Sequence, residues 1–208
     1  NTYVAQNKPD LAIKTYDKLN AEFKNGSFTS KAILRQGLIY YNSDKDEQAL
    51  TKFKKVAADF PKTPEALEAV STARLIYVDN GKVDEYASWV RTLDFVAVTD
   101  AELDNDTYEA AEKQYLQNNT KQAISGFSGY VGKFPNGIHP LKANFYLAQS
   151  YFSDGQETKS IPNYEYVIAQ PRNEFTEQSL ARLAQIFLKN DDKSKAIPVL
   201  TRLENEAD

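Results

Sequence analysis

The sequence contains no cysteine and no methionine, and His139 is the single histidine among its 208 residues. Without cysteine there is no disulfide, zinc ribbon, iron–sulfur cluster or thiol nucleophile. One histidine leaves little scope for a histidine-based metal site, so we expect neither a metal nor a cofactor. No run of 18 apolar residues occurs, so no segment is expected to span a membrane. No stretch has the pattern of a signal peptide, and because no initiator methionine is present we expect a piece of a longer protein.

The charge balance argues against a nucleic-acid-binding protein. Lysine and arginine number 25 against 29 aspartate and glutamate residues, which gives a net charge of −4. A chain with a pI of about 5.2 offers no electrostatic match to a phosphate backbone. Hydrophobic residues make up 41% of the chain, and glycine and proline number only eight each, which is typical of a folded domain and not of a disordered or fibrous one.

An internal repeat runs through the chain. A small residue recurs with a large apolar or aromatic side chain about four positions later, as in Ala49 with Phe53 and Ala123 with Phe127. The successive spacings between the small residues are 37, 38, 36, 37 and 36. These small residues are Ala12, Ala49, Ala87, Ala123, Ser160 and Ala196. A fixed period of this length is the signature of a repeat architecture.

Each repeat unit is predicted to contain two helices. Apolar residues recur at spacings of three and four in five segments, which are 30–42, 66–79, 103–117, 140–153 and 176–189. Each segment is followed by a polar break and then by a second amphipathic run that ends near proline. A small residue where two helices cross allows their backbones to approach, and the aromatic residue one turn later fills the adjacent groove.

The repeat pattern resembles that of the tetratricopeptide-repeat family. Residues 30–61 carry it most completely, with Ile33, Gly37, Tyr40, Ala49, Phe53 and Pro61 at the family's spacing. The resemblance implies an all-α fold, a right-handed superhelical solenoid of antiparallel helix pairs with about 11 helices. It covers residues 1–208 as one array: the second helix of a cut repeat at 9–24, then repeats at about 30–61, 66–98, 103–135, 140–171 and 176–208. The period exceeds the family's 34 residues, and residues 66–100 lack clean small and aromatic positions.

The resemblance also implies a binding groove. In this family the first helix of each pair lines a concave surface, and the matching positions hold tyrosine, which favours interfaces. The partner-binding residues expected from it are Lys31, Arg35, Tyr41, Tyr108, Glu109, Glu112, Tyr115, Tyr146, Gln149 and Arg182. The chaperone-binding carboxylate clamp of some members is not supported, because only Lys31 and Arg35 fit it.

Several local patterns in the sequence have residue types that occur in chemical sites. His139 is expected to be a solvent-facing residue at a helix start, and Asp104-Asn105-Asp106 to serve as a helix cap or turn and not a calcium loop. Gly126, Gly129 and Gly132 indicate close helix packing or a groove that admits a ligand backbone. The acidic stretch at 94–112 is either a solvated face or a docking patch for a basic segment.

We therefore predict a non-catalytic protein–protein interaction scaffold that is not an enzyme and binds a peptide or protein surface in the concave groove. The alternative is a fragment of a helical-repeat nutrient-binding lipoprotein that takes up glycans at an outer membrane. The long units also resemble those of bacterial envelope proteins, which implies the periplasm or an outer-membrane association, with the cytoplasm as the other possibility. Partner, pathway, host organism and oligomeric state are not determined by the sequence.

Overall fold

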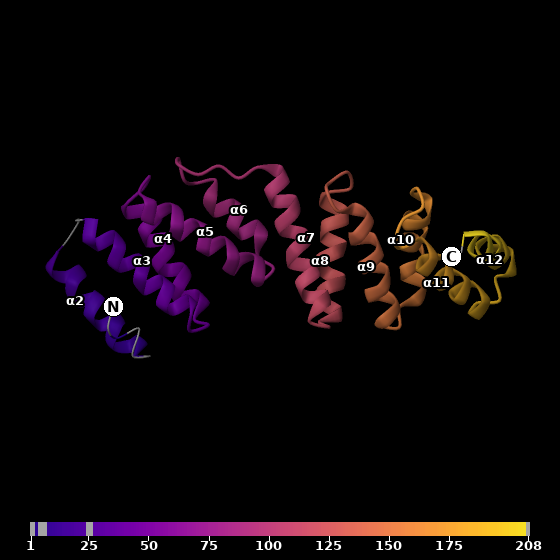
Figure 1. Ribbon diagram of the computed structural model, residues 1–208, viewed down its shortest axis with the longest axis horizontal. Coiled ribbons are helices and arrows are strands. Elements are labelled where there is room, and N and C mark those ends of the chain that lie inside the picture. Colours follow the sequence, from indigo (N-terminus) through magenta and orange to yellow (C-terminus); the bar gives the residue numbers. More distant parts are fainter. Residues whose placement is uncertain (1–2, 4–7, 24–26, 207–208) are drawn as a thin grey trace. The chain divides into compact units, whose positions relative to one another are not determined.

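The computed structural model describes residues 3, 8–23 and 27–206, and within them the regular secondary structure is all helical, with no strand (Figure 1). Residues 8–23 and 27–206 contain eleven helices, which are α2 (Pro9–Glu22), α3 (Ser27–Tyr41), α4 (Asp46–Asp59), α5 (Pro64–Asp79), α6 (Val83–Val90), α7 (Asp100–Leu116), α8 (Thr120–Lys133), α9 (Pro140–Ser153), α10 (Glu157–Ala169), α11 (Thr176–Lys189) and α12 (Lys193–Glu206). The predicted all-α class, antiparallel helix pairs and helix number are confirmed. Residues 24 and 207–208, which end the expected first helix and last repeat, lie outside the described residues.

The chain forms two compact units, residues 1–99 and residues 100–208. In unit 1, each of the helices α2 to α6 packs against the next one along the chain, around a core that includes Phe53, Val56 and Ile76. In unit 2, the helices α7 to α12 do the same around Phe127 and Tyr164. That residues 1–208 form a single array stays a prediction, because each unit is described by itself. None of the helices in the described part of the chain is long and apolar enough to cross a membrane.

The turn inside each helix pair has the same backbone geometry. One residue in each turn takes a left-handed conformation with φ between 54° and 75°. These five residues are Asp44, Gly81, Asn118, Gly155 and Asp191. The next N–H then bonds to a carbonyl of the last helical turn, as from Lys45 to Tyr40 at 3.0 Å. Glycine, asparagine and aspartate tolerate this conformation best, so the polar breaks of the sequence are helix C-caps that reverse the chain at a fixed interval.

The small residues of the repeat lie where the helices of a pair cross. Ala49, Ala123 and Ser160 are completely buried. Gly37 in α3 lies so close to α4 that a Cβ atom there would be 2.5 Å from Cε1 of Phe53. Among the three glycines of α8, only Gly126 has such a neighbour, since a Cβ atom there would be 2.8 Å from that of Ala111. Close packing therefore explains Gly126, whereas nothing lies within 4 Å of a Cβ atom built at Gly129 or Gly132.

The expected repeat at 66–98 departs from the others in its second half. Its second helix, α6, contains eight residues, whereas α4 and α8 contain fourteen each. Residues 91–99 after α6 are not helical. Their apolar side chains, Leu93, Phe95, Val96 and Val98, pack against the core of unit 1. The irregular small and aromatic positions in this repeat thus correspond to a shortened helix and a packed connecting segment.

Two residues expected at the surface lie in a polar network between α7 and α9. Asp104 is 4% exposed and lies inside α7, not at a helix cap. It accepts hydrogen bonds from the Tyr130 hydroxyl and, at 2.7 Å, from the N–H of Ile138. His139 is half-buried, its ring stacks on Tyr108 with centroids 4.3 Å apart, and its Nε2 lies 2.9 Å from Oδ1 of Asn105. The solvent-facing role expected for His139 and the cap role expected for Asp104 are therefore wrong.

The acidic stretch at 94–112 is not a single solvated face. Asp106, like Asp104, is buried, and it is only 1% exposed. Asp94 is exposed and pairs with Lys62 at 3.0 Å. Only part of the stretch, including Asp100 and Glu109, faces solvent. The exposed carboxylates of this stretch therefore do not form one continuous acidic patch, because Asp104 and Asp106 are buried between Glu102 and Glu109.

Candidate functional site

In unit 1, the predicted binding residues lie on α3. Lys31 and Arg35 are one helical turn apart, and both side chains are exposed. Tyr41, at the end of the same helix, is half-buried and packs against the core of unit 1. The structure therefore places two exposed cations next to each other on the first helix of the pair α3–α4, and it gives Tyr41 a part in packing.

In unit 2, two predicted tyrosines meet across neighbouring first helices. Tyr115 of α7 and Tyr146 of α9 have ring centroids 4.6 Å apart and ring planes inclined by 33°. Both are half-buried and rest on Phe127, at 6.4 and 5.8 Å. Burial raises the pKa of both hydroxyls, and the nearby Glu112 adds to the effect at Tyr146. The pair therefore offers one rigid aromatic surface with neutral hydroxyls at neutral pH.

Tyr108 differs from the role expected of it. Only 4% of the residue is exposed, and the ring of His139 covers it. Its hydroxyl donates to Oε1 of Glu112 at 2.6 Å. Burial and this carboxylate raise the pKa of Tyr108 well above its usual value. Tyr108 has almost no surface to offer a partner, because the residues after α8 close over it.

Glu109 and Glu112 do not form a free pair of carboxylates. Glu109 is exposed and accepts a hydrogen bond from Nδ2 of Asn105 at 2.7 Å. Glu112 is half-buried and is held by the hydroxyl of Tyr108. The two side chains are engaged on α7 by different partners. Of the two, Glu109 remains the more accessible to a basic group.

Gln149 and Arg182 extend the surface along α9 to α11. Oε1 of Gln149 accepts a hydrogen bond from the buried Tyr164 hydroxyl at 2.9 Å. The guanidinium of Arg182 lies over the ring of Phe152, 4.3 Å from its centroid, and donates to Gln185 at 3.0 Å. Stacking on an aromatic ring leaves the edge of a guanidinium free to donate to a carboxylate.

These contacts define one continuous surface in unit 2, which we call the aromatic strip. Tyr146, Gln149 and Phe152 follow one another at spacings of three along α9. Tyr115 joins this row from α7 through Tyr146, and Arg182 joins it from α11 through Phe152. The strip combines ring faces, neutral hydroxyls, an amide and one cation. Such a surface is suited to holding a peptide or protein segment by contact area and hydrogen bonds.

Sequence reasoning missed one aromatic residue at the border of the strip. Phe175 stacks on Phe145, with centroids 4.3 Å apart and planes at 21°, and meets Tyr146 edge-on at 6.2 Å. It stands at the N-cap of α11, before the amphipathic pattern of that helix begins. A search for helical spacing does not identify Phe175, because the residue precedes the helix. A phenylalanine in an otherwise polar connecting segment does, however, indicate packing against the core.

No group of three histidine, aspartate or glutamate side chains that could hold a metal ion occurs within residues 8–23 and 27–206. A search of curated proteins finds no match to the chain. A family model described as tetratricopeptide repeat matches residues 31–63, which include most of α3 and all of α4. This is the stretch that carries the repeat pattern most completely in the sequence.

Solved structures of helical repeats are similar to the chain at low identity. One is a tetratricopeptide repeat protein from Parabacteroides merdae, with 12% identity, a TM-score of 0.38 and coverage of 100% of this chain and 90% of that one. Another is the C-terminal part of a repeat-containing protein from Cytophaga hutchinsonii, with 16% identity, a TM-score of 0.41 and coverage of 97% and 92%. A third holds the repeats of a kinesin light chain from Podosopora anserina, with 16% identity, a TM-score of 0.41 and coverage of 84% and 93%.

The family match coincides with the helix pair in which every feature of the repeat is present. Gly37 meets Phe53 at the crossing, Ala49 is completely buried beside it, and Asp44 turns the chain between α3 and α4. Neither the match nor the short turns between paired helices supports the glycan-binding alternative, which would need long loop insertions. Residues 31–63 therefore match the tetratricopeptide-repeat model over the helix pair α3–α4.

Proposed function

We propose that the chain is a non-catalytic scaffold that binds a peptide or a protein surface on the first-helix face of unit 2, the face that lines the groove in this family. The observation that carries the proposal is the aromatic strip, in which Tyr115 and Tyr146 form one ring surface and Arg182 lies at the other end of the row. Tetratricopeptide repeats generally serve as protein-interaction scaffolds, which agrees with the chemistry of this surface.

The composition of the strip supports binding and not catalysis. Tyrosine and arginine are enriched among the residues that contribute most to protein interfaces. Tyrosine buries a large area with little loss of side-chain entropy, and arginine donates several hydrogen bonds from one planar group. Tyr115 and Tyr146 are held in place by Phe127 before any partner arrives. Pre-organised side chains lower the entropic cost of association. The neutral hydroxyls and the Arg182 guanidinium would donate hydrogen bonds to backbone carbonyls or carboxylates of the partner.

The proposal is tested by capture of partners from a lysate of the source organism. Truncation of an anchoring aromatic residue commonly lowers binding by about 2 kcal/mol or more, which is about 30-fold in affinity. The variant with both Tyr115→Ala and Tyr146→Ala should therefore lose partners that the wild type retains. Tyr166→Ala serves as the matched control, since Tyr166 is also half-buried in unit 2 but belongs to the second helix α10.

Folding is controlled separately, because the two tyrosines also contact Phe127. The thermal midpoint of each variant is measured, and Arg182→Gln is added as a variant that leaves the packed rings in place. Loss of the same partners in both the tyrosine variant and Arg182→Gln, with Tyr166→Ala unaffected, supports the aromatic strip. Equal recovery of every partner by wild type and folded strip variants contradicts it.

A further inference from the structure

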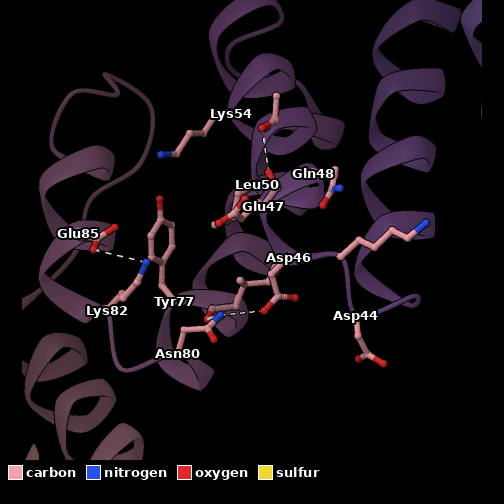
Figure 2. A pocket seen from close by; sticks show the side chains of 13 residues that line it. Asp44, Asp46, Glu47, Gln48, Leu50, Lys54, Tyr77, Asn80, Lys82 and Glu85 are labelled. Atoms are coloured by element: carbon pink, nitrogen blue, oxygen red, sulfur yellow. Dashed lines mark hydrogen bonds and ion pairs between the residues drawn. The ribbon is translucent and has the colours of Figure 1, made fainter.

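A depression of about 670 Å³ lies in unit 1, apart from the aromatic strip (Figure 2). Its walls come from the first half of α4, the C-terminal end of α5 and the start of α6. Along α4, Glu47, Leu50 and Lys54 follow one another at spacings of three and four, so they line one wall. Tyr77 of α5 and Glu85 of α6 stand opposite. The site is formed mainly by second helices, not by the first-helix face.

Lys54 is held in this depression without an anionic partner. Its ammonium lies 5.6 Å from the ring centroids of both Tyr77 and Trp89. Within the described residues no carboxylate lies within ion-pair distance of it. Its neighbour Lys55, by contrast, pairs with Asp59 at 2.6 Å. Lys54 is exposed, and the two rings attract its ammonium while leaving its hydrogen-bond donors available to another group.

Tyr77 presents a second unused donor at the same place. The residue is only 2% exposed, yet no group among the described residues forms a hydrogen bond with its hydroxyl. The buried hydroxyls of Tyr130 and Tyr164 are satisfied by Asp104 and Gln149. Figure 2 shows the Tyr77 hydroxyl pointing into the depression, toward the Lys54 ammonium. Among the described residues, the buried side-chain atoms without a hydrogen-bond partner are Oδ1 of Asn20 and Oγ of Ser179, so the Tyr77 hydroxyl is reached from the depression and is free to donate to a ligand there.

We propose that this depression is a docking site for an acidic side chain of a partner peptide. The carboxylate would accept hydrogen bonds from the Lys54 ammonium and the Tyr77 hydroxyl, and both would be charge-assisted. Glu85 on the opposite wall already pairs with Lys82 at 3.8 Å, whereas Glu47, on the same helix as Lys54, repels a free anion but suits a basic residue next to the acidic one. Charge complementarity therefore selects a peptide that carries both signs. This site does not depend on the function proposed for unit 2.

Trp89 provides a direct readout of binding, because it is the only tryptophan of the chain and Lys54 lies beside its ring. The full chain is titrated with an end-blocked alanine-based peptide that carries one glutamate and one lysine a helical turn apart. Two comparison ligands are the same peptide with glutamine in place of glutamate, and free N-acetylglutamate. Tryptophan emission and titration calorimetry give the affinity of each.

Three variants locate the contact. Lys54→Gln removes the charge, Tyr77→Phe removes only the hydroxyl and keeps the ring, and Lys55→Gln changes the adjacent lysine on a different face of α4. A hydrogen bond to a charged group corresponds to about tenfold in affinity or more. We expect saturable binding of the glutamate peptide, about tenfold weaker binding by Lys54→Gln and by Tyr77→Phe, and unchanged binding by Lys55→Gln.

Several outcomes of these titrations would contradict the proposed docking site. Absence of saturable binding to the wild type overturns the proposal, as does equal affinity for the glutamine peptide. An unchanged affinity in both Lys54→Gln and Tyr77→Phe would show that the peptide binds elsewhere. Equal affinity for free N-acetylglutamate would overturn the peptide assignment and identify a site for a small carboxylic acid.

Discussion

Gly37 in α3 lies against the ring of Phe53, and its replacement by alanine is expected to destabilise the protein. An added Cβ atom would be 2.5 Å from Cε1 and 2.8 Å from Cδ1 of that ring. Phe53 is completely buried, so the ring has no free space into which it can move. The close contact must therefore be relieved by separating α3 from α4 or by distorting the ring.

The magnitude follows from two opposing effects. Alanine is about 1 kcal/mol more favourable than glycine inside a helix. Overpacking a tight interior typically costs about 1–3 kcal/mol. The net loss in free energy of unfolding is therefore about 1 kcal/mol, in spite of the better helix propensity. Gly129→Ala is the matched control, because Gly129 is also helical but nothing lies within 4 Å of a Cβ atom there. It should gain about 1 kcal/mol.

Thermal and urea unfolding of the two variants, followed by circular dichroism, test this difference in sign. Gly37→Ala should unfold below the wild type and Gly129→Ala above it, because only the first introduces a clash. Stabilisation of both variants by the same amount would show that α3 and α4 do not cross closely at Gly37, and the repeat register derived from the small residues would be refuted.

Other expected outcomes concern the same packing and the polar network of unit 2. Ala49→Leu and Ala123→Leu should each lower the free energy of unfolding by about 1–3 kcal/mol, which denaturant unfolding measures, because both sites are completely buried. Gly137→Ala should lower the thermal midpoint, since its Cβ atom would collide with Oδ2 of Asp104. Burial and Asp104 raise the pKa of the Tyr130 hydroxyl, so its contribution to stability is complete below about pH 10 and is lost as the pH rises further. Stability measured from pH 8 to 11 should fall less steeply in Tyr130→Phe than in the wild type.

The helices and their crossings could be predicted from the sequence because they depend on local patterns. Apolar spacing of three and four located the first helices, and the polar breaks located the turns, where Gly81 and Asn118 take the left-handed conformation. The interval between small residues identified the crossings, since Ala49 and Ser160 are completely buried. Each of these features is set by residues within one helix pair.

The polar network of unit 2 could not be predicted, because it joins residues that are far apart in the sequence. Asp104 and Ile138 are 34 positions apart, and their hydrogen bond exists only once the segment after α8 folds back onto α7. The same segment brings His139 over Tyr108. Tyr108 was therefore expected to be exposed because of its position on α7, whereas the segment between α8 and α9 buries it.

The predicted binding residues also divide into those that a sequence pattern can indicate and those that only packing brings together. Tyr115, Tyr146 and Arg182 were found from their positions in the repeat, and the structure places them along one strip with α9 at its centre. Lys54 and Tyr77 belong to different helices and carry no shared pattern in the sequence. Lys54 and Tyr77 come together in the depression between α4, the end of α5 and the start of α6. This depression exists only once the three helices have packed.

The central claim is that the first-helix face of unit 2 binds a protein partner, and site-specific photo-crosslinking tests it most directly. A photoreactive phenylalanine derivative is introduced in place of Tyr146 on α9, and in a second protein in place of Tyr166 on α10. After irradiation in cells of the source organism, the account predicts a covalent adduct with a discrete protein at position 146 and none at position 166. Adducts at position 166 alone, or at neither position in folded proteins, would contradict it.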